Sequence, residues 1–180
     1  MAKQYPQITD QHQAFIQQQK MFFVGTAGAQ GRVNVSPKGM DSLRVMGPNR
    51  VVWLSVTGSG NESAAHVAEN GRMTVMFCSF EGAPTILRLY GQARAVHSRD
   101  RDWETLLGEF PPMPGVRQLF DITVDLVQTS CGMAVPLYEY AGDRDALNQW
   151  AHKKGPEGIE AYWQEKNKVS IDGKPTHLFS

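Results

Sequence analysis

The residues best suited to bind an anion lie in one Gly-rich polar segment, residues 57–61. This segment joins an apolar, strand-like run, residues 50–56, to a helix-like run that begins at Ser63. The first turn of a helix leaves backbone N–H groups free, and the helix dipole favours negative charge there. Glycines let the backbone approach a ligand closely, and Asn61 is suited to cap the helix. The spacing therefore predicts a phosphate site; the alternative is a turn that only connects two elements.

The bulk composition gives no second route to an anion site. Eighteen basic residues balance eighteen acidic ones, so nucleic acid and anionic membrane surfaces are not expected partners. The N-terminus lacks an apolar signal core and no apolar run is long enough to span a bilayer, which predicts a cytoplasmic protein. Cys78 and Cys131 lie far apart, so neither a disulfide framework nor a metal site is expected.

The elements that must position the Gly-rich segment are mostly strands. Strands are expected over residues 21–27, 32–36, 50–56, 72–80, 85–96 and 122–129, and helices over 9–19, 63–69, 100–107, 145–153 and 157–167, with a helical turn over 116–120. Asp10 is expected to cap the first helix. Tight turns between strands favour antiparallel pairing in a small barrel, and the βαβ alternation of dinucleotide-binding folds is missing. We expect one mainly β domain over residues 1–180, with a barrel core at about 21–140 and a helical tail at about 143–180.

An ordered set of short segments resembles the pyridoxamine 5′-phosphate oxidase superfamily. The set comprises residues 32–39, 53–55, 61–66, 72–77 and 87–91, and the resemblance covers residues 21–97. Residues 130–136 and 167–173 are similar to a largely uncharacterised branch of that superfamily. The resemblance implies an FMN-binding split β-barrel, a Greek-key-like barrel of six antiparallel strands with peripheral helices, that forms a homodimer.

The resemblance also implies which residues lie beside the cofactor. In the family a basic strand that ends in lysine lies next to the flavin, and here that strand is residues 32–38. Lys38 is then either a positive charge near the flavin or a solvated residue after a turn. The implied cofactor-binding residues are Arg32, Asn34, Val35, Ser36, Lys38, Ser55, Thr57, Ser59, Asn61, Glu62, Ser63 and Arg88. No catalytic residue is assigned.

One departure from the family pattern concerns the phosphate. The family's Ser-Arg-Lys cluster is replaced here by Glu62, Ser63 and Ala64, so the basic pair is lost. Either backbone N–H groups and the polar loop hold the phosphate, with Arg32, Arg88 or Lys38 neutralising it, or the site is degraded. Arg88 lies in the middle of an apolar strand and needs a partner, which is either a carboxylate or the flavin.

The resulting hypothesis is an FMN-dependent oxidoreductase that acts on an unknown small molecule at a dimer-interface site. Oxidation of vitamin B6 is not expected, because the parent enzymes' substrate-binding segments do not match residues 99–104 and 174–180. The alternatives are a flavin- or haem-sequestering protein, with His66 and His177 as candidate haem ligands, a deazaflavin-dependent reductase, and a structural homodimer with an empty site.

Overall fold

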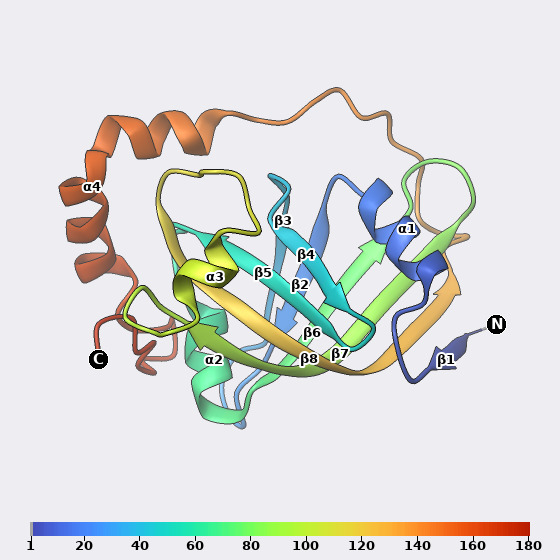
Figure 1. Ribbon diagram of the computed structural model, residues 1–180, viewed down its shortest axis with the longest axis horizontal. Coiled ribbons are helices and arrows are strands. Elements are labelled where there is room, and N and C mark those ends of the chain that lie inside the picture. Colours follow the sequence, from blue (N-terminus) through green and yellow to red (C-terminus); the bar gives the residue numbers. More distant parts are fainter. Residues whose placement is uncertain (1) are drawn as a thin grey trace.

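The computed structural model describes residues 2–180, which form an antiparallel sheet flanked by helices (Figure 1). The strands are β1 (Lys3–Tyr5), β2 (Phe22–Thr26), β3 (Asn34–Lys38), β4 (Leu43–Gly47), β5 (Arg50–Val56), β6 (Arg72–Cys78), β7 (Thr85–Val96) and β8 (Val116–Cys131). The helices are α1 (Asp10–Gln18), α2 (Glu62–Asn70), α3 (Trp103–Leu107) and α4 (Ala146–Lys166). The expected mainly β split-barrel fold with peripheral helices is confirmed.

The sheet is strongly curved but not closed. Its order is β3-β2-β6-β7-β8-β5-β4, and β1 pairs with β8 outside this path. β3 and β4 are therefore edge strands. Neither β1 nor β4 was expected from the sequence, so the described residues hold eight strands where six were expected. The single-domain boundaries predicted from the sequence stay a prediction.

Residues 116–120 form the first part of β8, so the helical turn predicted there is wrong. β8 pairs with β5 in a register that places Leu119 opposite Leu54, and both side chains are completely buried. A surface helical turn would expose part of this run, whereas residues 117–120 are all buried. Pairing with two neighbouring strands decided the conformation, and such pairing is not visible in a five-residue window.

The position of β5 in the sheet explains why its sequence lacks the alternation of apolar and polar residues that is typical of a half-exposed strand. Val51 and Trp53 pack into the main core, where the Trp53 ring stacks on Phe120 at 4.7 Å between centroids. Val52 and Leu54 face a second core beneath α3. Because both faces of β5 are buried, the apolar run 51–54 is continuous. Packing against a core on each face holds β5 in place, and with it Ser55 and the Gly-rich segment that follows.

The helix ends are set by local hydrogen bonds. Thr9, rather than the predicted Asp10, caps α1, because its hydroxyl accepts a hydrogen bond from the backbone N–H of His12 at 3.3 Å. α2 ends as predicted at Gly71, which takes the left-handed conformation with φ of 72° and donates to the Val67 carbonyl. α4 is interrupted at Gly155, so the two predicted tail helices are confirmed. Within residues 2–180, no helix combines the length and apolar composition needed to cross a membrane.

Candidate functional site

A cavity of about 430 Å³ lies where β3, β5 and the start of α2 meet. Its floor is the Gly-rich segment, residues 57–61, and β8 contributes Arg117 to its wall. Most of the residues implied by the resemblance line this cavity: Asn34, Ser36, Lys38, Ser55, Thr57, Ser59, Asn61, Glu62 and Ser63. The fold therefore brings together two segments, 34–38 and 55–63, that the sequence analysis had connected only through the resemblance.

Lys38, the last residue of β3, is one of two cations at this cavity. Its ammonium nitrogen lies 5.2 Å from the centroid of the Trp53 ring, within the range of a cation–π contact. Burial, and secondarily the positive charge of Arg117, lower the pKa of Lys38 to about 8. Lys38 is therefore not the solvated residue of the alternative interpretation. Near neutral pH it offers a charge that an anion would stabilise.

Arg117 is the second cation, and the sequence analysis missed it. Its side chain is 7 % exposed and donates to the Gly60 carbonyl at 2.9 Å and to Asn167 Oδ1 at 2.6 Å. A longer contact of 3.4 Å joins Arg117 Nη2 to the Ser55 hydroxyl. All three partners are neutral, and the buried Arg117 Nε has no hydrogen-bond partner within residues 2–180. Burial lowers the pKa of Arg117 to about 10.

A buried guanidinium without a neighbouring carboxylate is costly. Among the ion pairs of the described residues, none involves Arg117 or Lys38. The two cations therefore create a positive region that a bound anion would neutralise. The sequence did carry a signal for this site, since Arg117 lies next to Val116 and two residues before the apolar pair Leu119 and Phe120. In the predicted helical turn the side chain of Arg117 has no defined direction, whereas in the strand β8 it lines the cavity.

The start of α2 adds uncharged donors. The backbone N–H groups of Glu62 and Ser63 begin the helix and have no acceptor in the part of the chain that the structure describes. Asn61 lies at the N-cap position, but its side chain does not cap the helix as predicted. Instead its amide exchanges two hydrogen bonds with Gln118, of 3.3 and 2.8 Å. That buried pairing fixes the Gly-rich segment to β8, next to Arg117.

A second hydrogen-bonded chain orients the opposite wall. The Asn34 amide donates to the Ser63 hydroxyl at 3.3 Å and lies 3.5 Å from the Thr26 hydroxyl. Thr26 in turn contacts His66 Nδ1 at 3.0 Å. His66 is 1 % exposed. These contacts place the buried His66 behind the residues that line the cavity.

The C-terminal tail closes the outer side of the Gly-rich segment. Besides binding Arg117, the buried Asn167 donates to the Gly58 carbonyl at 3.2 Å. Trp163 Nε1 donates to the Thr57 hydroxyl at 2.8 Å. The carboxylate of Glu62 accepts the backbone N–H of Ile171 at 3.0 Å and so faces the tail. The tail thus determines which groups of this segment remain available to a ligand.

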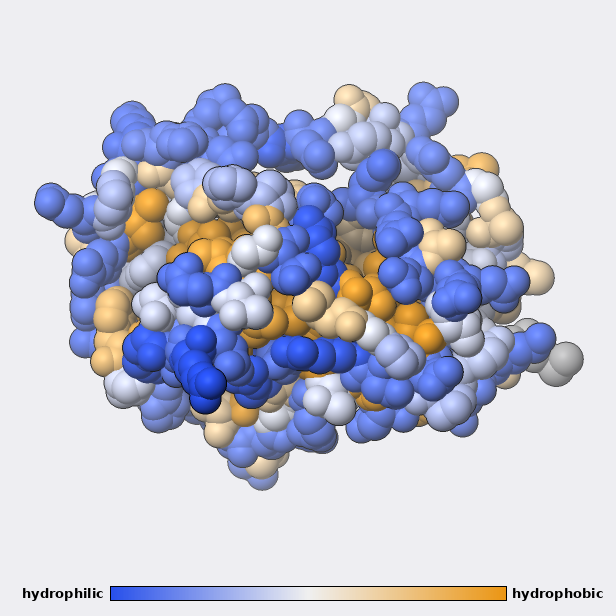
Figure 2. All heavy atoms as spheres, in the orientation of Figure 1, coloured by the Kyte–Doolittle hydropathy of each residue, from blue (hydrophilic) through white to orange (hydrophobic). Residues whose placement is uncertain are grey.

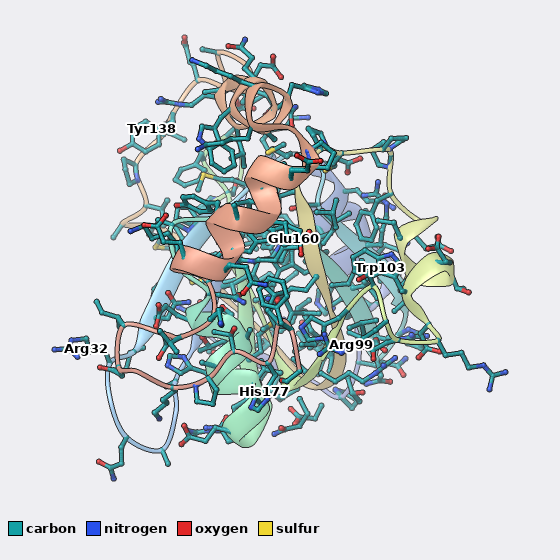
Figure 3. All side chains as sticks on the ribbon, turned by 90° about the vertical axis from the view of Figure 1, so that its left-hand side faces the viewer. Arg32, Arg99, Trp103, Tyr138, Glu160 and His177 are labelled. Atoms are coloured by element: carbon teal, nitrogen blue, oxygen red, sulfur yellow. The ribbon has the colours of Figure 1, made fainter. Side chains whose placement is uncertain are left out.

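Three of the implied residues lie away from the cavity. Arg32 points outward from the body of the protein, where it pairs with Asp172 (Figure 3). Val35 is 66 % exposed on the opposite face of β3. Arg88 neither pairs with a carboxylate nor lines the cavity. Its guanidinium donates to the Ser130 hydroxyl at 3.1 Å. Arg117, which comes from β8, lines the cavity together with Lys38, whereas Arg32 and Arg88 do not.

The fold is a split antiparallel barrel, and two cations, Lys38 and Arg117, line the cavity at the N-terminus of α2. The family model described as pyridoxamine 5′-phosphate oxidase matches residues 8–131. A similar protein in Aspergillus flavus, the pyridoxamine 5′-phosphate oxidase family protein ustO, is 33 % identical over 95 % of this chain and 76 % of its own length. The chain belongs to the pyridoxamine 5′-phosphate oxidase family.

Solved structures support the same fold. A histidine-to-alanine variant of HupZ from Group A Streptococcus is similar with a TM-score of 0.56 and 19 % identity, over 68 % of this chain and 99 % of that one. HutZ from Vibrio cholerae, described as a heme storage protein, is similar with a TM-score of 0.52 and 18 % identity, over 70 % of this chain and 97 % of that one. At these identities the likeness concerns the fold alone.

Proposed function

We propose that this protein binds FMN in the cavity between β3, β5 and α2 and acts as an FMN-dependent oxidoreductase on a small molecule. The observation that carries the proposal is Arg117, a buried cation without an anionic partner beside the Gly-rich segment. The family provides the context, because its model is that of a pyridoxamine 5′-phosphate oxidase. FMN offers both a phosphate for the cations and a ring for the polar side of β3.

The residues present fit this group. The phosphate would be held by Arg117, Lys38 and the free N–H groups at the start of α2, which together replace the family's lost basic pair. Asn34, Ser36 and the Ser55 hydroxyl would hydrogen-bond the remaining polar groups of the cofactor. When bound, FMN supplies two-electron chemistry through its ring. The chain's own contribution is to bind and orient it and to place the positive charge of Lys38 nearby.

We further propose that two copies assemble into a homodimer. The edge strand β3 exposes Val35, and Val33 just before it is 71 % exposed. The Arg32–Asp172 ion pair ties the tail to this segment, and there Ile171 is likewise 71 % exposed and Val169 is 54 % exposed. Exposed apolar side chains gathered along an unpaired edge strand mark a surface that a partner covers. A second copy is the partner that the family resemblance implies.

The test is an absorbance spectrum of the purified full chain after titration with FMN and removal of the excess. We expect flavin bands retained at about one per chain. A Soret band instead would support haem binding, for which HutZ is the precedent in fold. A protein that does not retain FMN, whether it is colourless or carries haem instead, would contradict the proposal. Turnover of a reduced nicotinamide with an electron acceptor then distinguishes an enzyme from a carrier.

A further inference from the structure

A second and larger cavity, of about 1210 Å³, lies at one end of the sheet. It is lined by α1 and the residues that follow it, the end of β3, the turn 79–85, the segment 132–145 that connects β8 to α4, and the start of α4. Figure 1 shows where these elements lie. The connecting segment runs along the top of the molecule, and Figure 2 shows the surface hollowed beneath it. A connection of this length without a helix or strand is uncommon in a compact domain unless it has a function.

Aromatic rings face this cavity from several sides. Phe15 comes from α1, Phe80 from the turn, and Tyr138 and Tyr140 from the connecting segment. The rings of Phe80 and Tyr138 lie 5.4 Å apart, and Tyr138 is nevertheless 61 % exposed. Tyr138 and Tyr140 are the exposed rings among these, and exposed rings that line a hollow offer faces on which another planar ring can stack.

Few hydrogen bonds hold the connecting segment over the cavity. The Tyr138 backbone N–H donates to the Phe80 carbonyl at 3.0 Å, and the Tyr140 N–H donates to Glu81 Oε1 at 3.3 Å. The ammonium of Lys20 adds a cation–π contact at 5.6 Å from the Tyr140 ring. These contacts fix both tyrosines against the turn 79–85 and leave the space between the segment and α1 unfilled.

The two cavities meet at one place. Pro37, Lys38, Gly39, Met40 and Leu147 line both of them. Met40 and the following Asp41 have positive φ angles of 63° and 52°, which non-glycine residues rarely adopt. The Ser42 hydroxyl, bonded to the Gly39 carbonyl at 2.6 Å, and the Arg44–Asp41 ion pair hold this strained turn. Strained backbone that surrounding contacts enforce is typical of ligand sites.

We propose that the larger cavity is the substrate chamber and that it takes a planar aromatic molecule, which reaches the cofactor cavity past Lys38 and Met40. The chamber's lining supplies ring faces for stacking, and the shared wall places one end of its occupant beside the neighbouring cavity. The assignment of the occupant as a substrate rests on the proposed FMN function. The existence of an aromatic-binding chamber does not depend on that function.

The probe for this chamber is anilinonaphthalene sulfonate, an aromatic anion with a planar naphthalene ring, whose fluorescence rises when it leaves water. The full chain is titrated as wild type, as Ala83→Trp, which fills the chamber from the turn 79–85, and as Tyr138→Ala, which removes a stacking face. Met133→Trp is the matched control, because Met133 lies on the same connecting segment but does not line the chamber. FMN binding is measured separately on each protein.

We expect one saturable probe site per chain, weakened about tenfold or more by Ala83→Trp and by Tyr138→Ala and unchanged by Met133→Trp. In protein loaded with FMN, the probe should shift the flavin absorption band of wild type but not of Ala83→Trp.

Probe affinity that is unchanged in both chamber variants, or a flavin band that does not shift when the probe binds, overturns the inference. So does a change of oligomeric state in Ala83→Trp, which would make this cavity an interface between copies. If FMN fails to bind while the chamber variants still weaken the probe, the chamber stands and the FMN proposal fails.

Discussion

Lys38 and Arg117 face the same cavity from strands at different positions in the sheet, and the positive charge of Arg117 contributes to the lowered pKa of Lys38. β3 is an edge strand, whereas β8 lies between β7 and β5. Two cations that destabilise one another are retained in a folded protein at a cost in stability, which a bound anion would offset. The mutual repulsion of these two residues is the basis of the first two predictions.

Replacing Arg117 with methionine should separate ligand binding from stability. The substitution removes a buried charge and keeps similar volume, so the free energy of unfolding without ligand should stay within about 2 kcal/mol of wild type despite the lost hydrogen bonds. Affinity for FMN should fall about a hundredfold, equivalent to roughly 2.8 kcal/mol. Urea unfolding and equilibrium titration with FMN measure the two quantities.

The matched control for this variant is Arg72→Met on β6, where the arginine is exposed and lines neither of the two cavities. It should bind FMN like wild type. If Arg117→Met binds FMN with unchanged affinity while it remains folded, the phosphate is not held where we place it.

The lowered pKa of Lys38 makes both stability and anion binding depend on pH. Below about 8, Lys38 is charged in the folded and the unfolded chain, so the full cost of burying its charge is present. Between about 8 and its ordinary value of 10.5, the unfolded chain binds the extra proton, so stability without ligand should rise with pH across this window. Affinity for FMN should fall over the same window as the charge is lost.

The Lys38→Met variant provides the comparison for these pH profiles. Its stability and its affinity for FMN should both be flatter than wild type between pH values of about 7 and 10. The second ionisation of the phosphate has a pKa of about 6 and is nearly complete by pH of about 7, so it adds little slope in this range. Parallel profiles for the two proteins would show that Lys38 does not titrate beside the ligand.

Local signals in the sequence were sufficient for most elements of the fold. The β7 boundaries agree with the predicted strand 85–96, because a turn at residues 82–84 precedes an alternating run. The stop of α2 at Gly71 follows from the conformational freedom of glycine. β4 was missed, since its residues are all of intermediate burial at a sheet edge and give little periodicity.

The site was harder to predict than the fold, for a reason that Arg117 illustrates. Positions 34–38 and 55–63 belong to segments that the resemblance already connected, and the structure brings them together at the cavity. Arg117 reaches the cavity only because β8 pairs with β5, a contact between residues far apart in the chain. Arg32 and Arg88 were plausible from residue type alone, but their partners Asp172 and Ser130 lie 140 and 42 residues further along the chain.

Asn167 should be important for stability although it lies in the tail. It is completely buried and joins Arg117 to the Gly58 carbonyl, while its own carbonyl accepts the Thr176 hydroxyl at 2.6 Å. Asn167→Leu leaves a buried donor and a buried acceptor without partners, which should cost about 2–4 kcal/mol in urea unfolding. The exposed neighbour Lys168 is the control, and Lys168→Ala should unfold like wild type. A loss below about 1 kcal/mol for Asn167→Leu would mean that the tail does not hold the Gly-rich segment.

The apolar surface on β3 and the tail predicts how the dimer can be weakened. Val35→Lys and Ile171→Lys place charges on side chains that are already exposed in the single chain, so neither should destabilise the isolated fold by more than about 0.5 kcal/mol. Buried in an interface without a partner, the same charges should raise the dimer dissociation constant at least tenfold. Light scattering after size exclusion over a dilution series measures this constant.

Met133→Lys, at a side chain that is 82 % exposed on the segment 132–145, controls for added charge and should leave the dimer intact. A dimer that tolerates both charges would have to be formed through another face, and a wild-type chain that stays monomeric at all concentrations would remove the dimer proposal altogether.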